Sequence, residues 1–348
     1  MQLNELTGEQ RRQLIDSQQI YESWRLARQD RDRRFAGGMR WASRNGADYL
    51  LRKVGRSETS LGVRSPETEA AYDAFVSGRA HNRDRLVGLA RRLDEMAPVN
   101  VAMELGRVPV IAARIMRACD ERQLLGAHLV VVGTSAIFAY EAAAGVRVGS
   151  GLVATEDIDL LYDARRRIGL AFSDLQARGL IGLLQQIDAS FAPVRPRAFR
   201  ASNRDGFLVD LIRPEAKDVF RDRRRAALTD FPDDLEGAAI FGLDWLVNAP
   251  KLAAVAIDER GYPVPMVVID PRIFALHKAW LSARPDREPV KAARDIAQAR
   301  AAAAIATRYL RRAFDAPDLT ALPKALRDLA PAVTAAEGPG VSPDRPNW

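Results

Sequence analysis

The spacing of apolar residues predicts a helix, a β-hairpin and a long helix in the first part of the chain. Apolar positions recur at helical spacing within residues 1–35. An Asn-Gly pair at residues 45–46 then separates two short alternating runs, which is a strong hairpin signal because both residues tolerate positive φ. After a loop, a Ser-Pro-Glu sequence at residues 65–67 opens a helix that covers residues 68–95 as one segment or as two. The pattern predicts an N-terminal helical and β-hairpin module over residues 1–98, with a boundary near Pro98.

The next part of the chain, residues 99–215, mixes helical and strand patterns. A helix is predicted over residues 107–126, and a short, fully apolar strand over residues 128–132 runs directly into a Gly-Thr-Ser turn and another helix. A strand that contains acidic residues follows at 155–162, and helical spacing returns at 167–187. Two further strands at 196–201 and 206–214 predict a hairpin. The segment is therefore predicted to be an α+β core with a mixed sheet flanked by helices.

Beyond residue 215 the pattern becomes mainly helical. A polar, basic stretch leads to a second hairpin, whose turn contains Gly261, and helices dominate from Pro271 onward. The last residues are rich in proline, glycine and alanine, a composition typical of loosely attached chain. We therefore predict a C-terminal hairpin and helical region over residues 216–330 and a flexible tail over residues 331–348.

Composition excludes several classes of protein. The 348 residues are enough for about two domains. A single cysteine excludes a disulfide framework and a thiolate zinc cluster, and three histidines far apart in sequence argue against a histidine metal site. No apolar run is long enough for a spanning helix and the start is not signal-like, so a cytoplasmic protein that does not engage a membrane is expected.

The charge balance is basic. The chain has 52 Lys and Arg residues against 45 Asp and Glu residues, a formal net charge of +7. This excess is compatible with a polyanionic partner such as nucleic acid or a nucleotide phosphate. An ordinary solvated surface accounts for it equally well.

Three features of the predicted core carry candidate chemistry, and the first is the turn Gly133-Thr134-Ser135. A small residue between a strand and a helix lets a phosphate approach the backbone and the free N–H groups of the helix start. The hydroxyls of Thr134 and Ser135 would add donors. The motif is not a Walker A loop, and taken alone an ordinary turn with a helix cap explains it.

The second feature is the acidic pair Asp157 and Asp159. Residues i and i+2 of a strand share a face, so both carboxylates project together, while Glu156 points to the other face and is not counted as a ligand. Two close carboxylates repel one another unless a cation lies between them, and Mg²⁺ accepts one or two carboxylates together with substrate phosphates. A strand with solvated acids is the alternative, although the flanking residues are strongly apolar.

The third feature is Asp210, which lies within the apolar strand Phe207-Leu208-Val209-Asp210-Leu211-Ile212. A carboxylate in such surroundings needs a partner, either a bound cation or an arginine. If this strand lies beside the strand of Asp157 and Asp159, three carboxylates converge in the manner of a two-metal phosphoryl-transfer site. Asp157, Asp159 and Asp210 are therefore the candidate catalytic and metal-binding residues, with Mg²⁺ or Mn²⁺ as the ion.

The order of these elements resembles the nucleotidyltransferase fold of the DNA polymerase β-like superfamily. The superfamily pattern hG[GS], Dx[DE], h[DE]h corresponds here to Val132-Gly133-Thr134, Asp157-Ile158-Asp159 and Val209-Asp210-Leu211. Thr134 replaces the usual Gly or Ser, and the 24 positions from Gly133 to Asp157 exceed the spacing in compact members. Further motifs resemble a bacterial family of nucleotidyltransferase-fold proteins, namely MRWASRNGADYLLR, SLGVRSPETE, GTSAIFAYE, TEDIDLL and FALHKAWLSAR with KAARDIAQA.

The resemblance implies a role for cationic residues after the sheet. In the superfamily a lysine on a later helix contacts the triphosphate, and Lys278 is the matching position. Arg284, Arg287 and Lys291 are further candidates for nucleotide binding. Lys291 is also expected to pair with Asp295, one helical turn away.

The function implied is metal-dependent transfer of a nucleoside monophosphate from ATP or another NTP to an acceptor hydroxyl, with release of pyrophosphate. Asp157 and Asp159 would hold the metals, Asp210 would complete the site and orient the nucleophile, and the Gly133 turn would receive the triphosphate. The acceptor is RNA, protein or a small molecule, and the basic charge slightly favours RNA. Two alternatives remain open: a toxin/antitoxin or defence module with this chemistry, and a catalytically inactive scaffold that binds nucleic acid or protein.

Overall fold

The computed structural model describes residues 3–163, 173–196, 198–215, 228–229, 231 and 233–335. The start of the helix predicted at 167–187, the basic stretch after residue 215 and most of the predicted tail lie outside these ranges. The described chain forms two compact units, one made of residues 12–104 with 261–263 and the other of the remaining described residues. Both helices and strands are present, so the predicted α+β class is confirmed.

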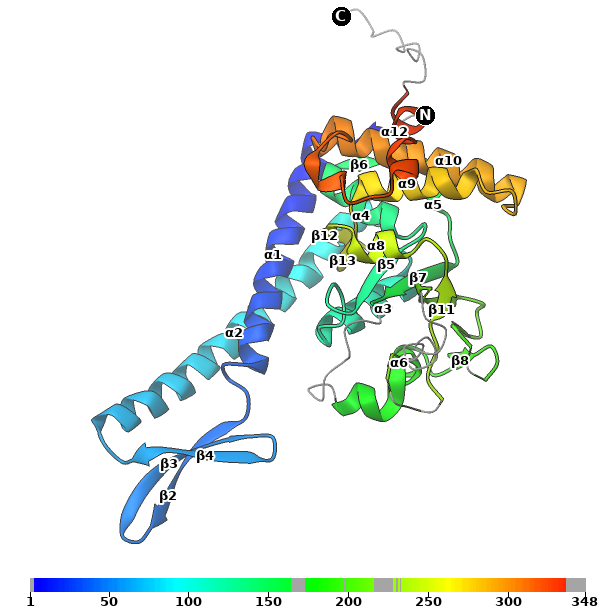
Figure 1. The fold of residues 1–348 in the computed structure, drawn as a ribbon. Coiled ribbons are helices and arrows are strands. Elements are labelled where there is room, and N and C mark those ends of the chain that lie inside the picture. The colour runs from blue at the N-terminus through cyan, green and yellow to red at the C-terminus, as the bar shows by residue number, and fades with distance from the viewer. Residues whose placement is uncertain are drawn as a thin grey trace, which may run out of the picture. The chain divides into compact units, whose positions relative to one another are not determined.

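The smaller unit contains a three-stranded antiparallel sheet and two helices (Figure 1). Its elements are α1 (Gly8–Asp32, from residue 12 onward), β2 (Gly38–Arg44), β3 (Ala47–Val54), β4 (Ser57–Val63) and α2 (Pro66–Ala102). Asn45 and Gly46 join β2 to β3 with φ of 52° and 77°, which confirms the predicted hairpin. Strand β4 was expected to be a loop. It is exposed along almost its whole length, and it therefore lacks the alternation that marks a half-buried strand.

Helix α2 continues through Pro98, near which the sequence predicts a module boundary, and ends at Ala102. A proline inside a helix removes one backbone hydrogen bond. The fully buried Asn100 provides compensating contacts beyond it. Its Oδ1 accepts hydrogen bonds from Gln13 Nε2 (2.9 Å) and Ser17 Oγ (3.1 Å), and its Nδ2 donates to the Gly261 carbonyl (2.8 Å). These contacts hold the last helical turn in place.

The larger unit is built on a mixed sheet, as predicted. Its strand order is β12-β13-β5-β7-β10-β9-β8, with β11 paired to β10. The bounds are β5 (Leu129–Val132), β7 (Asp157–Tyr162), β8 (Ala192–Pro193), β9 (Arg200–Ser202), β10 (Leu208–Pro214), β11 (Ala238–Ile240), β12 (Lys251–Ile257) and β13 (Pro263–Ile269). Strand β13 pairs in parallel with β5. The hairpin that the sequence analysis assigns to a separate C-terminal region therefore extends the same sheet.

Helices and short strands complete this unit. They are β1 (Asn4–Glu5), α3 (Val110–Glu121), α4 (Ala136–Ala144), β6 (Val146–Arg147), α5 (Ser150–Val153), α6 (Ser173–Ile187), α8 (Asp244–Asn248), α9 (Pro271–Ser282), α10 (Pro289–Ala304), α11 (Lys324–Arg327) and α12 (Ala330–Thr334), with a π-helical turn over Ile305–Tyr309 and a 3-10 turn over Pro317–Leu319. Helices α9 and α10 pack against one another along their length (Figure 1). None of the helices in the described ranges combines the length and the apolar character that crossing a lipid bilayer requires.

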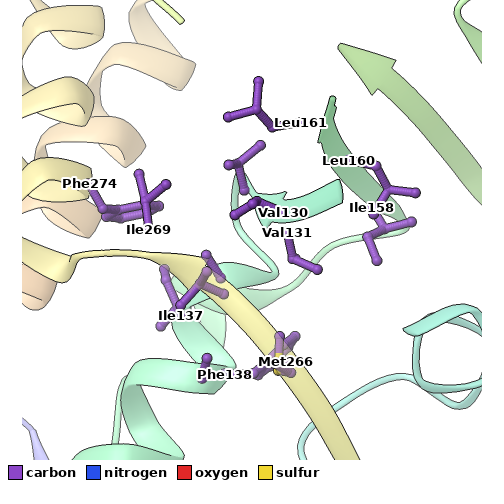
Figure 2. Close-up of a cluster of buried hydrophobic side chains, with 14 of the residues drawn as sticks. Val130, Val131, Ile137, Phe138, Ile158, Leu160, Leu161, Met266, Ile269 and Phe274 are labelled. Carbon is purple, nitrogen blue, oxygen red and sulfur yellow. The ribbon is translucent and has the colours of Figure 1, made fainter. Parts of the chain in front are cut away.

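The core of this unit lies between the central strands and the helices beside them. Figure 2 shows part of it, with buried side chains drawn from β5, β7, α4, β13 and α9, namely Val130, Val131, Ile158, Leu160, Leu161, Ile137, Phe138, Met266, Ile269 and Phe274. All four residues of β5 are buried, as its unbroken apolar run predicts. Full burial of one such side chain contributes about 1.5–3 kcal/mol. This core fixes the strand ends that carry the candidate site.

Candidate functional site

The predicted acidic strands lie side by side at the centre of the sheet. Strands β7 and β10 pair in parallel with Asp159 opposite Asp210, and β5 pairs antiparallel with β7 so that Val132 lies opposite Asp159. The end of β5, the middle of β7 and the middle of β10 thus meet at one place. Asp159 and Asp210 line a cavity of about 520 Å³ together with Gly133 and Lys278. This volume is typical of small-molecule sites.

Gly133 brings the backbone close to one of these carboxylates. Its φ is +64°, a conformation that side chains other than glycine rarely adopt. A Cβ atom added at this position would overlap with Oδ2 of Asp159. The turn after β5 can therefore approach the acidic strand only because residue 133 is glycine.

The two hydroxyl residues of the turn are engaged by the protein. Thr134 Oγ1 accepts a hydrogen bond from Nε2 of the fully buried Gln298 (3.2 Å), and Ser135 Oγ donates to the Asp157 carbonyl (3.3 Å). Among the described residues that line the cavity, Gly133 is present but neither hydroxyl residue is. The contact from Gln298 on α10 fixes the turn to the helical layer, and sequence reasoning did not foresee it because the two residues are 164 positions apart.

Asp159 carries excess negative charge. Burial is the largest cause that raises its pKa, to about 6, and repulsion by Asp157 and Asp210 adds to it, while Lys278 and Arg200 act in the opposite direction. Within the described part of the chain, no group donates a hydrogen bond to this carboxylate. The neighbouring Asp157 projects from the same face of β7, and its Oδ1 accepts a hydrogen bond from the Thr155 hydroxyl. A cation between the two carboxylates would relieve the repulsion.

Asp210 has a different environment from the one predicted for a third metal ligand. Antiparallel pairing of β9 with β10 places Arg200 directly opposite it. Arg200 Nε and one terminal nitrogen donate to the two Asp210 oxygens, each at 2.6 Å. Of the two partners that the sequence left open, a cation or an arginine, the structure contains the arginine. No cluster of three or more His, Cys, Asp or Glu side chains arranged to hold a metal occurs among the described residues.

Three basic side chains, called the cationic wall below, line the same cavity as these carboxylates. They are Lys278, Arg284 and Arg287, for which a role in nucleotide binding is predicted. The buried Asp295 of α10 orients two of them, because its carboxylate accepts hydrogen bonds from Lys278 Nζ (2.7 Å) and Arg287 Nε (2.7 Å). Arg284 pairs with Asp286 (2.8 Å), also on the cavity wall. Sequence reasoning missed the part that Asp295 plays here.

The predicted Lys291–Asp295 pair is wrong. Lys291 is exposed and pairs with Glu288 at 2.9 Å, and it does not line the cavity. Asp295 lies in the interface between α9 and α10, where the buried Lys278 outcompetes an exposed lysine one turn away.

A cluster of aromatic side chains, called the aromatic wall below, adjoins the cavity; it consists of Phe241, Trp245, His277 and Trp280. Phe241, which is 62% exposed, lies 6.0 Å from the Trp280 ring, and Trp245 lies 5.1 Å from Trp280 (both between centroids). His277 packs against both tryptophans, and Phe241 and His277 line the cavity together with aliphatic residues. This wall was not among the predicted features. Only His277 and Trp280 have a signal in the sequence, because their spacing places them on one face of α9, whereas Phe241 lies in the turn before α8.

The pH dependence of stability should report the burial of His277. The pKa of this imidazole is lowered to about 3, mainly by burial, with smaller contributions from Lys278 and Arg287 that Asp295 opposes. The unfolded chain takes up a proton below about pH 6.5 that the folded protein does not, so this group alone lowers stability as the pH falls, by about 2 kcal/mol at pH 5. Asp159 contributes an opposite pH dependence to wild type and variant alike, so we expect urea unfolding to show a gain in stability from pH 5 to pH 8 that is about 2 kcal/mol larger in the wild type than in His277→Gln. The exposed His81→Gln should retain the wild-type slope, and an unchanged slope in His277→Gln would contradict the assignment.

The cavity thus combines an acidic floor, a cationic wall and an aromatic wall. It can hold an anionic group against the cations, a planar ring against the aromatic side chains and a divalent cation on the carboxylates. Among known protein families, the model described as "Nucleotidyltransferase" matches residues 111–323, which include the residues of the floor and of both walls. Comparison with curated proteins and with solved structures gives no match.

Proposed function

Since the match covers more than half of its length, the chain belongs to this nucleotidyltransferase family, and we propose that it transfers a nucleoside monophosphate from an NTP to an acceptor hydroxyl. The acceptor oxygen forms a bond to the α-phosphorus, the bond from that phosphorus to the β-phosphate oxygen breaks, and pyrophosphate and the hydroxyl proton leave. The observation that carries the proposal is the register of β5, β7 and β10. It joins Gly133 to Asp159 and Asp210 on the floor of a cavity that also has a cationic wall. We place the core in the polymerase β-like superfamily on this strand arrangement.

The carboxylates of β7 fit a divalent cation, Mg²⁺ or Mn²⁺. Asp157 and Asp159 share one face of the strand. Burial, and after it the negative charges of Asp157 and Asp210, raise the pKa of Asp159, and a bound cation would stabilise its ionised form. Magnesium is commonly held by one or two carboxylates together with substrate phosphates. When bound, such an ion polarises the phosphate and stabilises the charge that develops in transfer. Asp157 and Asp159 are therefore the residues that we assign to it.

The rest of the cavity accounts for binding of the nucleotide. We place the triphosphate between the Gly133 turn and the side chains of Lys278, Arg284 and Arg287, whose charge compensates that of the phosphates. Asp295 holds Lys278 and Arg287 in position by accepting their hydrogen bonds. The aromatic wall offers the exposed Phe241 ring to the base, because stacking on an aromatic side chain suits any nucleobase.

A second candidate function is supported by one observation. Both oxygens of Asp210 are bonded to Arg200, as expected for a domain that keeps the fold as a scaffold for nucleic acid or protein and has lost catalysis. We favour the enzyme because Asp159 has no such paired arginine among the described residues and lines the same cavity as Lys278, Arg284 and Arg287.

The two candidates are separated by a transfer assay. The purified protein is incubated with each α-³²P-labelled NTP, Mg²⁺ or Mn²⁺, total RNA and a cell lysate, and label is sought in RNA, protein and small molecules. We expect transfer by the wild type and a loss of at least about 100-fold in Asp157→Ala.

Glu156→Gln is the matched control, because Glu156 precedes the same strand and lines a different cavity beside Asn203 and Arg204. It should retain wild-type transfer. Absence of label with every NTP and both metals, together with RNA binding that does not need a metal, would instead support the scaffold.

A further inference from the structure

The pairing of Arg200 with Asp210 supports an inference that rests on the proposed function and concerns the charge balance among the acidic residues of the site. We infer that Arg200 takes the place of a second metal ion: Asp210 holds its guanidinium as a fixed positive charge beside Asp157 and Asp159, and the site binds one divalent cation. Asp210 is then the residue that positions Arg200 and does not ligate the metal.

The geometry of the pair makes Asp210 a poor metal ligand. The carboxylate is buried, and both of its oxygens accept charge-assisted hydrogen bonds of 2.6 Å from one planar guanidinium. Strand pairing fixes the two residues directly opposite one another, so the contact does not depend on flexible surface chain. The guanidinium takes one lone pair on each oxygen, so a cation at Asp210 would have to use the remaining lone pairs directly beside a fixed positive charge. Repulsion between the two cations disfavours that arrangement.

The guanidinium is close enough to act on the other two carboxylates. Asp210 has the largest effect that raises the pKa of Arg200, and the charges of Asp157 and Asp159 raise it further. Arg200 in turn lowers the pKa of Asp159. Three carboxylates and one arginine leave two negative charges, which a single divalent cation neutralises. A second divalent cation would leave the floor of the cavity positive before any substrate enters.

Arg200 also retains the capacity to bind substrate. Its side chain is 36% exposed, and its guanidinium has five N–H groups. Two of these, on Nε and on one terminal nitrogen, donate to Asp210. The guanidinium carbon lies 5.5 Å from the ring centroid of Phe199, a residue of the cavity wall. Arg200 itself is not among the described residues that line the cavity, but its remaining donors lie beside this wall residue and suit a phosphate oxygen, which an arginine can bind without the geometry that a metal demands.

The test is the number of Mn²⁺ ions bound without nucleotide, measured by titration with electron paramagnetic resonance on the full chain. We expect one Mn²⁺ per wild-type chain and loss of at least tenfold in affinity in Asp159→Asn. Asp210→Asn should keep one Mn²⁺ with affinity within about threefold of wild type, since Asp210 is not a ligand. Arg200→Gln, which frees the Asp210 carboxylate, should bind a second Mn²⁺ or bind the first at least tenfold more tightly.

Two further variants protect the test against misfolding. The double variant Arg200→Gln with Asp210→Asn removes both charges and should again bind one Mn²⁺. Arg200→Lys keeps the positive charge but loses the two parallel donors of the guanidinium. It should bind one Mn²⁺, with a KM for the NTP between those of wild type and Arg200→Gln. Two Mn²⁺ ions in the wild type, none at all, or a loss in Asp210→Asn equal to that in Asp159→Asn would overturn the inference. Because stoichiometry is read without turnover, absence of transfer with one Mn²⁺ bound would count against the proposed function alone.

Discussion

Asp159→Asn is expected to abolish nucleotidyl transfer and to stabilise the protein above pH 6 when no divalent cation is present. Burial and the charges of Asp157 and Asp210 raise the pKa of the Asp159 carboxyl to about 6, above its ordinary value of 3.8. The folded protein therefore binds this proton more tightly than the unfolded chain does. The contribution to stability is largest at low pH and is lost as the pH rises towards 6, by up to about 3 kcal/mol. The amide carries no charge and avoids this loss.

Divalent cations should reverse the order of stability. A cation that binds only the folded wild type raises its free energy of unfolding, and the variant without the carboxylate should not respond. The measurement is urea unfolding at pH 5 and pH 8, in EDTA and in Mg²⁺, with transfer assayed in parallel. Glu156→Gln is the control and should behave as the wild type under all four conditions. A variant that is no more stable than wild type at pH 8 in EDTA, or that responds equally to Mg²⁺, would exclude Asp159 from the cation site.

The elements around the site were predictable because their signals are local. An unbroken apolar run ending at Gly133 predicts a buried strand followed by a turn, and alternation predicts that Asp157 and Asp159 share a face. The hairpin of β9 and β10 also follows from two short apolar runs and the polar turn between them. Each of these features depends on residues within about ten positions of one another.

What the sequence left undecided depends on register and on distant contacts. The length of the β9–β10 turn sets the strand register that places Arg200 opposite Asp210, and composition does not fix that length. Asp295 bonds Lys278 of another helix instead of its neighbour Lys291, because a buried partner gains more from the ion pair than an exposed one does. The aromatic wall joins Phe241 to Trp280, two residues that no local pattern connects. These long-range pairings turn the predicted acidic strands into a cavity with distinct walls.

The Gly133→Ala variant is expected to lose both stability and activity. Its loss of stability should exceed that of a variant in which alanine replaces a positive-φ glycine that has open space around it. Alanine at a φ of +64° costs about 1–2 kcal/mol. In addition, its Cβ would overlap with Asp159 Oδ2, so the turn after β5 or the carboxylate itself must move. We expect a total cost of about 2–5 kcal/mol, since overpacking of this kind adds about 1–3 kcal/mol. Transfer should fall at least about 100-fold, because displacement of a reacting centre by 1 Å has effects of that size.

The Gly206→Ala variant separates the cost of the backbone conformation from the cost of the steric overlap. Gly206 has a φ of +83°, lies in the turn between β9 and β10, and has no atom within 4 Å of an added Cβ. It should therefore show the cost of the backbone conformation alone, about 1–2 kcal/mol, with transfer unchanged. Urea unfolding of both variants in EDTA gives the two free energies, and their difference measures the contact between Gly133 and Asp159. If the two variants lost equal stability and Gly133→Ala still transferred nucleotide at the wild-type rate, the close approach of this turn to the carboxylate would have no part in the reaction.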